Sequence, residues 1–106
     1  MKIIGRTRST EPCQEAGWVP FTYCTDDPID ETFVMSLRHR LDLLRPGCSF
    51  LFMPRLARPF FKIQSDDCLV RGIIGDRQFV VAVDGDDTDK ADTLAGVPEK
   101  GRPRPA

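Results

Sequence analysis

The sequence predicts one small α+β domain, in which a single amphipathic helix packs on a mainly antiparallel sheet of four to six strands. Three observations lead to this prediction. The chain has 106 residues, of which 41% are hydrophobic, and this suits a single modest core. Residues 28–44 carry apolar side chains at helical spacing. Short runs of β-forming residues, separated by polar turns, occur on both sides of that segment.

The helix is predicted over residues 28–44. Asp27 can cap its N-terminus, because a carboxylate oxygen accepts from the free amides of the first turn, and Pro28 suits the first helical position. Pro46 and Gly47 end the helix, since proline lacks an amide proton and glycine permits the turn. The apolar stripe expected to face the sheet consists of Phe33, Leu37, Leu41 and Leu44.

The sheet is predicted from β-forming runs, the last four of which follow one another closely and favour an antiparallel meander. The continuous apolar run 49–54 is typical of a central strand covered on both faces. Pro20 indicates an edge strand or a bulge, because it cannot donate a ladder hydrogen bond. Gly72 predicts a bulge and Gly75 a hairpin turn. The predicted strands are residues 2–8, 18–24, 49–54, 59–64, 68–74 and 78–83.

The chain is expected to divide into a domain over residues 1–84 and a disordered charged tail over residues 85–106. The tail has no periodic apolar pattern, so it is not expected to bury enough apolar surface to offset the entropy of ordering. We find no apolar run typical of a signal peptide or a membrane span, which predicts a cytosolic protein without membrane contact. The net charge of −1 argues against a protein that holds nucleic acid by bulk charge.

The cysteines are separated by more than ten residues in every case, and the chain has one histidine. Zinc sites usually take two ligands from a tight pair such as C-x-x-C, because one turn then aims both sulfurs at one metal. We therefore predict no metal and no other cofactor, and expect free thiols in a reducing compartment. A metal or thiol protein remains the more distant alternative, built on Cys13, Cys24, Cys48 and Cys68.

No catalytic combination is evident in the sequence. Hydrolysis or acyl transfer needs a nucleophile, a base and an orienting group close together. His39, the sole histidine, lies opposite the apolar stripe on a helical wheel, so we expect an exposed surface side chain rather than a general base. The sequence therefore predicts a protein that is not an enzyme.

The outer face of the predicted helix is not uniformly polar. Met35, His39 and Leu43 recur at four-residue intervals opposite the core stripe. Two interpretations stay open. In the first, another part of the domain covers these side chains. In the second, they form an interface for a partner or a second copy, because apolar strips suit interfaces. The pattern alone does not choose between them, since isolated apolar surface residues are common.

Positive charge concentrates in the middle of the chain. Between residues 35 and 62 there are six Lys and Arg residues and one acidic residue. Arg38 and Arg45 belong to the predicted helix and its end, and Arg55 and Arg58 to a hairpin tip bracketed by prolines. Guanidinium groups suit phosphates or an acidic protein surface. The simpler interpretation is a hairpin that keeps the domain soluble.

These features together predict a small non-enzymatic protein-interaction module of the adaptor or inhibitor type. It would bind a partner protein, or a second copy of itself, through the outer helix face and the Arg-rich hairpin. The first alternative is a nucleic-acid-binding protein that uses the same helix and hairpin arginines. The residues expected to bind the partner are Met35, Arg38, His39, Leu43, Arg45, Arg55 and Arg58.

Overall fold

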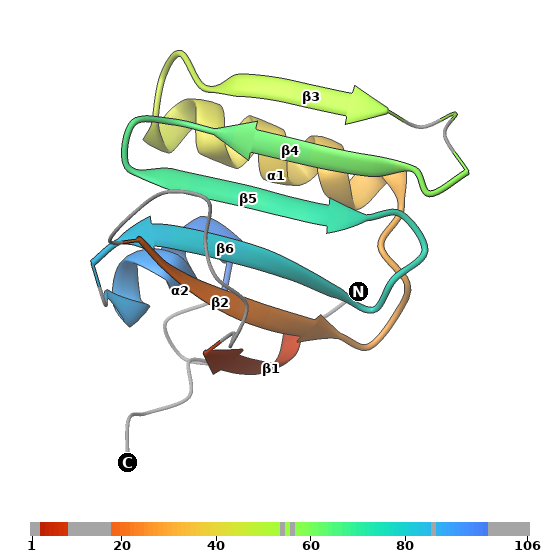
Figure 1. The fold of residues 1–106 in the computed structure, drawn as a ribbon, viewed down its shortest axis with the longest axis horizontal. Coiled ribbons are helices and arrows are strands. Elements are labelled where there is room, and N and C mark those ends of the chain that lie inside the picture. The colour runs from red at the N-terminus through yellow and green to blue at the C-terminus, as the bar shows by residue number, and fades with distance from the viewer. Residues whose placement is uncertain (1–2, 9–17, 54, 56, 86, 98–106) are drawn as a thin grey trace.

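The computed structural model describes residues 3–8, 18–53, 55, 57–85 and 87–97. Within them, an antiparallel sheet is covered on one face by two helices, α1 (Glu31–Leu44) and α2 (Thr88–Ala95), so the α+β class is confirmed (Figure 1). In the part of the chain that is described, neither helix is long and apolar enough to cross a membrane. The strands are β1 (Ile3–Arg8), β2 (Trp18–Thr25), β3 (Ser49–Met53), β4 (Phe60–Gln64), β5 (Cys68–Ile73) and β6 (Gln78–Asp84).

The strands lie in the order β1-β2-β6-β5-β4-β3, and every neighbouring pair is antiparallel. The four strands β3 to β6 form the meander that the sequence predicts. The first two strands add to its β6 side, and α1 then carries the chain from β2 to the far edge of the sheet (Figure 1). The two edges of the sheet are therefore β1 and β3.

The helix α1 begins three residues later than predicted. Asp30, not Asp27, is its N-cap, and the Asp30 carboxylate accepts a 2.8 Å hydrogen bond from the amide of Phe33. The reason is the buried Ile29, which is held against the β5–β6 turn by two backbone hydrogen bonds. Its amide donates to the carbonyl of Asp76 at 2.8 Å, and its carbonyl accepts from the amide of Gly75 at 2.9 Å.

The buried stripe of α1 also differs in part from the predicted one. Leu37 and Leu41 are buried as expected, and Val34 joins them in the core. Leu44 is exposed, and Phe33 is only partly buried. The rings of Phe33 and Phe79 form a T-shaped pair at the border of the core, with their centres 5.2 Å apart.

The predicted central position of the apolar run at residues 49–54 is wrong, because β3 is the outermost strand of the sheet. Phe50 and Phe52 turn toward the helix-covered face and pack against the core. Leu51 and Met53 turn to the other face and are 46% and 38% exposed. A continuous apolar run indicates that both faces of a strand are apolar. It does not indicate whether the strand is central or at the edge of the sheet.

Two further expectations about the sheet need correction. The strand β2 is not an edge strand, because it lies between β1 and β6. Its ladder with β1 ends at Phe21, so Pro20, which has no amide proton to donate, lies outside that ladder. Gly72 is not at a bulge, because it pairs in regular register with Phe61 and Phe79. A Cβ atom there would lie 2.8 Å from Cε1 of Phe61, so the glycine makes room for the aromatic core. The turn at Gly75, with φ of 96°, is as predicted.

The structure also differs from the expected tail, because residues 88–95 form the helix α2. Asp87 caps its N-terminus through a 3.0 Å bond from the amide of Lys90, and Gly96 ends it in the left-handed conformation with φ of 87°. Short apolar side chains at helical spacing explain its packing on the sheet, even though the segment is polar overall. Those buried in the core are Ala91, Leu94 and Ala95, followed by Val97. The remainder of the expected tail, residues 98–106, lies outside the described residues.

Candidate functional site

The outer face of α1 carries exposed apolar side chains. Met35 is 46% exposed and Leu43 is 70% exposed, and His39 lies exposed between them. We call these three residues the α1 outer face. Together with Glu31, Thr32, Ser36 and Arg40 they line a shallow, open hollow along the helix. Because Val34, Leu37 and Leu41 anchor the opposite side in the core, the helix holds this strip in a fixed orientation.

Arg38 lies on the side of α1 that faces β3. Its guanidinium carbon is 4.4 Å from the centre of the Phe50 ring, which is a cation–π contact. Asp42 follows one turn later on the same side, at the i,i+4 spacing that allows a surface pair. Arg38 is therefore already engaged with the edge strand, beside the α1 outer face rather than within it.

Arg45 is held within the domain. Its Nε atom donates to both carboxylate oxygens of Asp67, at 3.1 and 3.0 Å, and Lys90 of α2 lies 2.9 Å from the same carboxylate. The hydroxyl of Ser65 donates to Asp67 at 2.8 Å. Burial acts to raise the pKa of Asp67, but these hydrogen bonds outweigh it and hold that pKa far below its usual value. We call Arg45, Ser65, Asp67 and Lys90 the Asp67 clamp.

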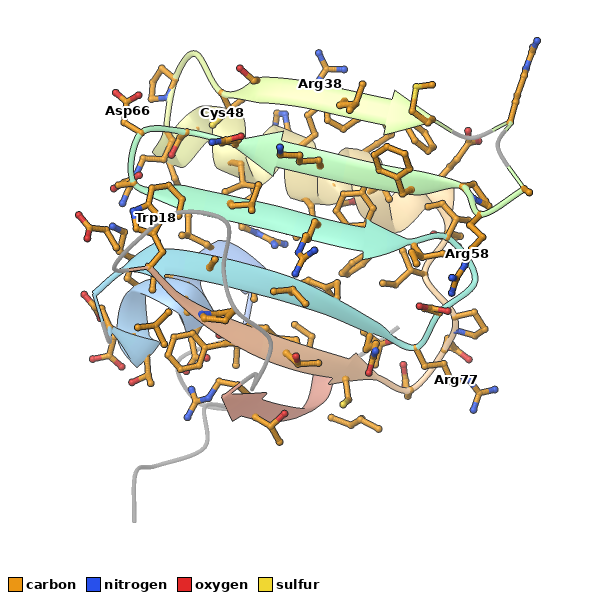
Figure 2. All side chains as sticks on the ribbon, viewed as in Figure 1. Trp18, Arg38, Cys48, Arg58, Asp66 and Arg77 are labelled. Atoms are coloured by element: carbon orange, nitrogen blue, oxygen red, sulfur yellow. The ribbon has the colours of Figure 1, made fainter. Side chains whose placement is uncertain are left out.

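Arg55 and Arg58 are exposed on the connection between β3 and β4. Arg45 precedes β3 and the two hairpin arginines follow it, so they occupy opposite ends of the sheet. Figure 2 shows Arg58 at one end, with Cys48 and Asp66 at the other. The structure therefore does not gather the four predicted arginines into one patch.

A buried polar cluster links the second helix to the first two strands. Asp92 of α2 is 1% exposed, and its carboxylate accepts from the hydroxyl of Tyr23 at 2.7 Å and from the guanidinium of Arg6 at 2.5 Å. Burial, reinforced by the bond to Asp92, raises the pKa of Tyr23, and the same carboxylate raises that of Arg6. A cavity of about 70 Å³ borders the cluster.

This cluster was not expected from the sequence, because it joins residues that are far apart in a chain without obvious pairing signals. The sequence holds one signal for it. Asp92 lies beside Ala91 and Ala95, two buried residues of a short capped helix, so it is on the buried side of that helix. Each carboxylate oxygen already accepts a strong hydrogen bond, and the side chain is out of contact with water. Asp92 is thus suited to fixing α2 on the sheet rather than to proton transfer.

The face of the sheet opposite the helices is hollowed to about 390 Å³. Lys62 and Arg71 are directly opposed on neighbouring strands β4 and β5, and both border this hollow. Its apolar wall is formed by Phe60, Ile73 and Val80. The hollow therefore combines an apolar wall with two adjacent cationic groups.

The described cysteines are free thiols. Cys48 donates to the carbonyl of Arg45 at 2.8 Å, and Cys68 lies 3.1 Å from the hydroxyl of Ser65. Burial raises the pKa of both thiols, which makes them poor nucleophiles at neutral pH. Within the described ranges, no three His, Cys, Asp or Glu side chains are placed to hold a metal ion, and Cys13 lies outside those ranges.

Comparison of the chain with models of known protein families, with curated proteins and with solved structures gives no match. The site must therefore be interpreted from its own geometry.

Proposed function

We propose that the protein is a small non-enzymatic interaction module that binds a partner protein through the α1 outer face. The observation that carries this proposal is the pair Met35 and Leu43, exposed on a helix whose other side is fixed in the core. Burying a fully exposed Met or Leu side chain is worth about 1.5–3 kcal/mol, because apolar surface leaves water, and the exposed fractions of Met35 and Leu43 reduce this value in proportion. A helix face with such anchors is a recurring recognition mode.

The hairpin arginines contribute to this proposal as a second, electrostatic element. Arg55 and Arg58 are exposed on the short connection between β3 and β4. Exposed guanidinium groups raise the association rate of an acidic partner more than they raise its final affinity. We therefore propose that the partner surface is apolar at its centre and acidic at one end.

The rival proposal, nucleic-acid binding, draws less support from this arrangement. Two of the four predicted arginines already make contacts within the domain, because Arg45 belongs to the Asp67 clamp and Arg38 contacts Phe50. Arg55 and Arg58 are the other two. Phosphate binding by a few cations loses affinity steeply with salt, whereas an apolar interface does not. Salt dependence therefore separates the two proposals.

The proposal is tested by affinity capture from the native host with the full chain as bait, quantified by mass spectrometry. The variant Met35→Asp/Leu43→Asp should lose the captured partner by at least about tenfold, since two charges would be buried in an apolar contact. A matched control, Ile4→Asp/Gln78→Asp, adds the same charge at exposed residues on other elements and should keep it. If the α1 variant keeps the partner, the proposal fails. Loss of the wild-type complex between about 0.1 and 0.5 M salt would favour nucleic acid or a purely ionic contact.

A further inference from the structure

The two edges of the sheet are protected very differently. Edge strands expose unpaired backbone groups, and proteins discourage unwanted pairing there with bulges and inward-pointing charges. The edge strand β1 has both devices: its register shifts between Ile3 and Gly5, and Arg6 points inward to Asp92. The edge strand β3 has neither, because its ladder with β4 is regular and its five residues carry no charge.

The exposed side chains of β3 are also unusual for a free edge. Leu51 and Met53 are two of the large apolar side chains most exposed to water in the described chain. On the other face, Phe50 and Phe52 are partly buried, and their rings lie 6.1 Å apart. An uncharged, apolar edge strand in regular register is a template for another strand.

We propose that β3 pairs antiparallel with β3 of a second copy of this chain, which joins two six-stranded sheets into one across a two-fold axis. A two-fold interface must be complementary to itself. The segment Phe50-Leu51-Phe52 has this property, because its pattern is the same read in either direction. With the axis at Leu51, each Phe50 lies opposite Phe52 of the second copy, and the two Leu51 side chains face each other. Aromatic and apolar cross-strand pairs are each worth about 0.2–1 kcal/mol.

The charges around the strand identify a second copy as the occupant. Arg55 follows the C-terminal end of β3. The N-terminal end of β3 lies beside the β4–β5 turn, because Ser49 pairs with Gln64, and this turn carries the exposed Asp66 at the same end of the sheet as Cys48 (Figure 2). Antiparallel pairing about Leu51 brings Arg55 of one copy opposite Gly47 of the other, at the end that carries Asp66 and where Arg45 is already paired with Asp67. The two ends of the strand are thus electrostatically complementary to each other, and the contact occurs twice.

This inference goes beyond the proposed function, because it uses the sheet edge rather than the α1 outer face, and the two share only Arg55. A five-residue strand offers a small interface, so a weak dimer is expected. The test is sedimentation equilibrium of the full chain from about 10 μM to about 1 mM, the range that detects Kd values near 0.1 mM. The wild type should pass from monomer to dimer over this range.

Charge exchange at the axis tests the register. Leu51→Lys and Leu51→Glu should each weaken dimerisation at least about tenfold, since like charges would face each other across the axis. An equal mixture of the two variants should dimerise again, because Lys then faces Glu. The matched control Ile4→Lys, at a 67% exposed residue on the protected edge β1, should dimerise as the wild type does.

The inference is overturned by a wild type that stays monomeric, by a Leu51→Lys variant that still dimerises, or by a mixture that does not regain the dimer. A measurement without any substitution guards against misfolded variants. Amide hydrogen exchange of the wild type should slow in residues 49–53 as concentration rises, and not in β1. Equal exchange in β3 at both extremes would also overturn the inference.

Discussion

The hydroxyl of Tyr23 on β2 donates a 2.7 Å hydrogen bond to the carboxylate of Asp92 on α2, across 69 positions of the chain. Tyr23 is fully buried and stacks on Phe79, with ring centres 5.5 Å apart. The contact thus ties the C-terminal helix both to the second strand and to the aromatic centre of the core.

Asp92→Ala should lower the free energy of unfolding by about 3–5 kcal/mol. The substitution leaves the buried Tyr23 hydroxyl and the partly buried Arg6 guanidinium without their acceptor, and removing one partner of a desolvated polar contact is the costly way to break it. Urea denaturation followed by circular dichroism measures the change. The control Asp89→Ala, at an exposed residue of the same helix, should cost less than about 1 kcal/mol. Equal effects of the two substitutions would show that Asp92 has no special role.

A chain that ends at Asp84 should be largely unfolded, because it lacks α2 and exposes the core beneath it. Burial of Leu94 contributes about 1.5–3 kcal/mol by itself, and a domain of this size has only about 5–15 kcal/mol in total. A chain that ends at Val97 keeps these contacts and should unfold as the full chain does. Thermal denaturation of the three chains compares them. A cooperative, unshifted transition in the chain ending at Asp84 would show that α2 is dispensable.

Gly72→Ala should destabilise the domain by about 1–3 kcal/mol through overpacking. The new methyl group would lie 2.8 Å from Cε1 of Phe61 and 3.1 Å from Cβ of Phe79, so a ring must move. Gly5→Ala is the matched control, because a Cβ atom there meets no neighbour within 4 Å. Denaturant midpoints at constant m-value measure both changes. A Gly72→Ala variant as stable as the wild type would show that the aromatic core yields easily.

The Asp67 clamp should make stability depend on pH in the acid range. The folded-state pKa of Asp67 lies below that of the unfolded chain, so its contribution is present above about pH 4 and is lost as the pH falls toward the folded value. Urea denaturation from about pH 7 to about pH 2 should therefore show a gap between wild type and Asp67→Asn that closes at low pH. Asp66→Asn, on the same turn, serves as the control and should follow the wild type. A gap that stays constant with pH would contradict this account.

The elements with strong local signals could be predicted from the sequence. The stripe Leu37 and Leu41 gives helical periodicity, and the meander from β3 to β6 has regular strand spacing, so both follow from patterns within a few neighbouring residues. The sequence alone puts the start of α1 three residues too early, because Asp27 and Asp30 are both good caps. Burial of Ile29 against the β5–β6 turn decides between them, and that contact is not local.

The features that sequence patterns could not supply all depend on tertiary partners. The helix α2 is eight residues long and mostly polar, so its stability comes from packing and from Asp92 rather than from propensity. The sequence leaves two interpretations open for Met35 and Leu43, since a helical wheel shows which face is outer but not what covers it. The position of Arg45 beside Asp67 and the edge position of β3 both required the strand order.

The pairing of β2 with β6 has a consequence for how the chain folds. That ladder matches Trp18 with Asp84, so most of the chain must be enclosed in one loop before the sheet is complete. The meander needs only short closures, and closing a long loop costs more entropy than closing a short one. We therefore expect residues 49–84 to collapse early and the docking of β1, β2 and α2 to limit the refolding rate. During that interval the β6 side of the meander is a second open edge, and aggregation on refolding should be most severe before β2 arrives.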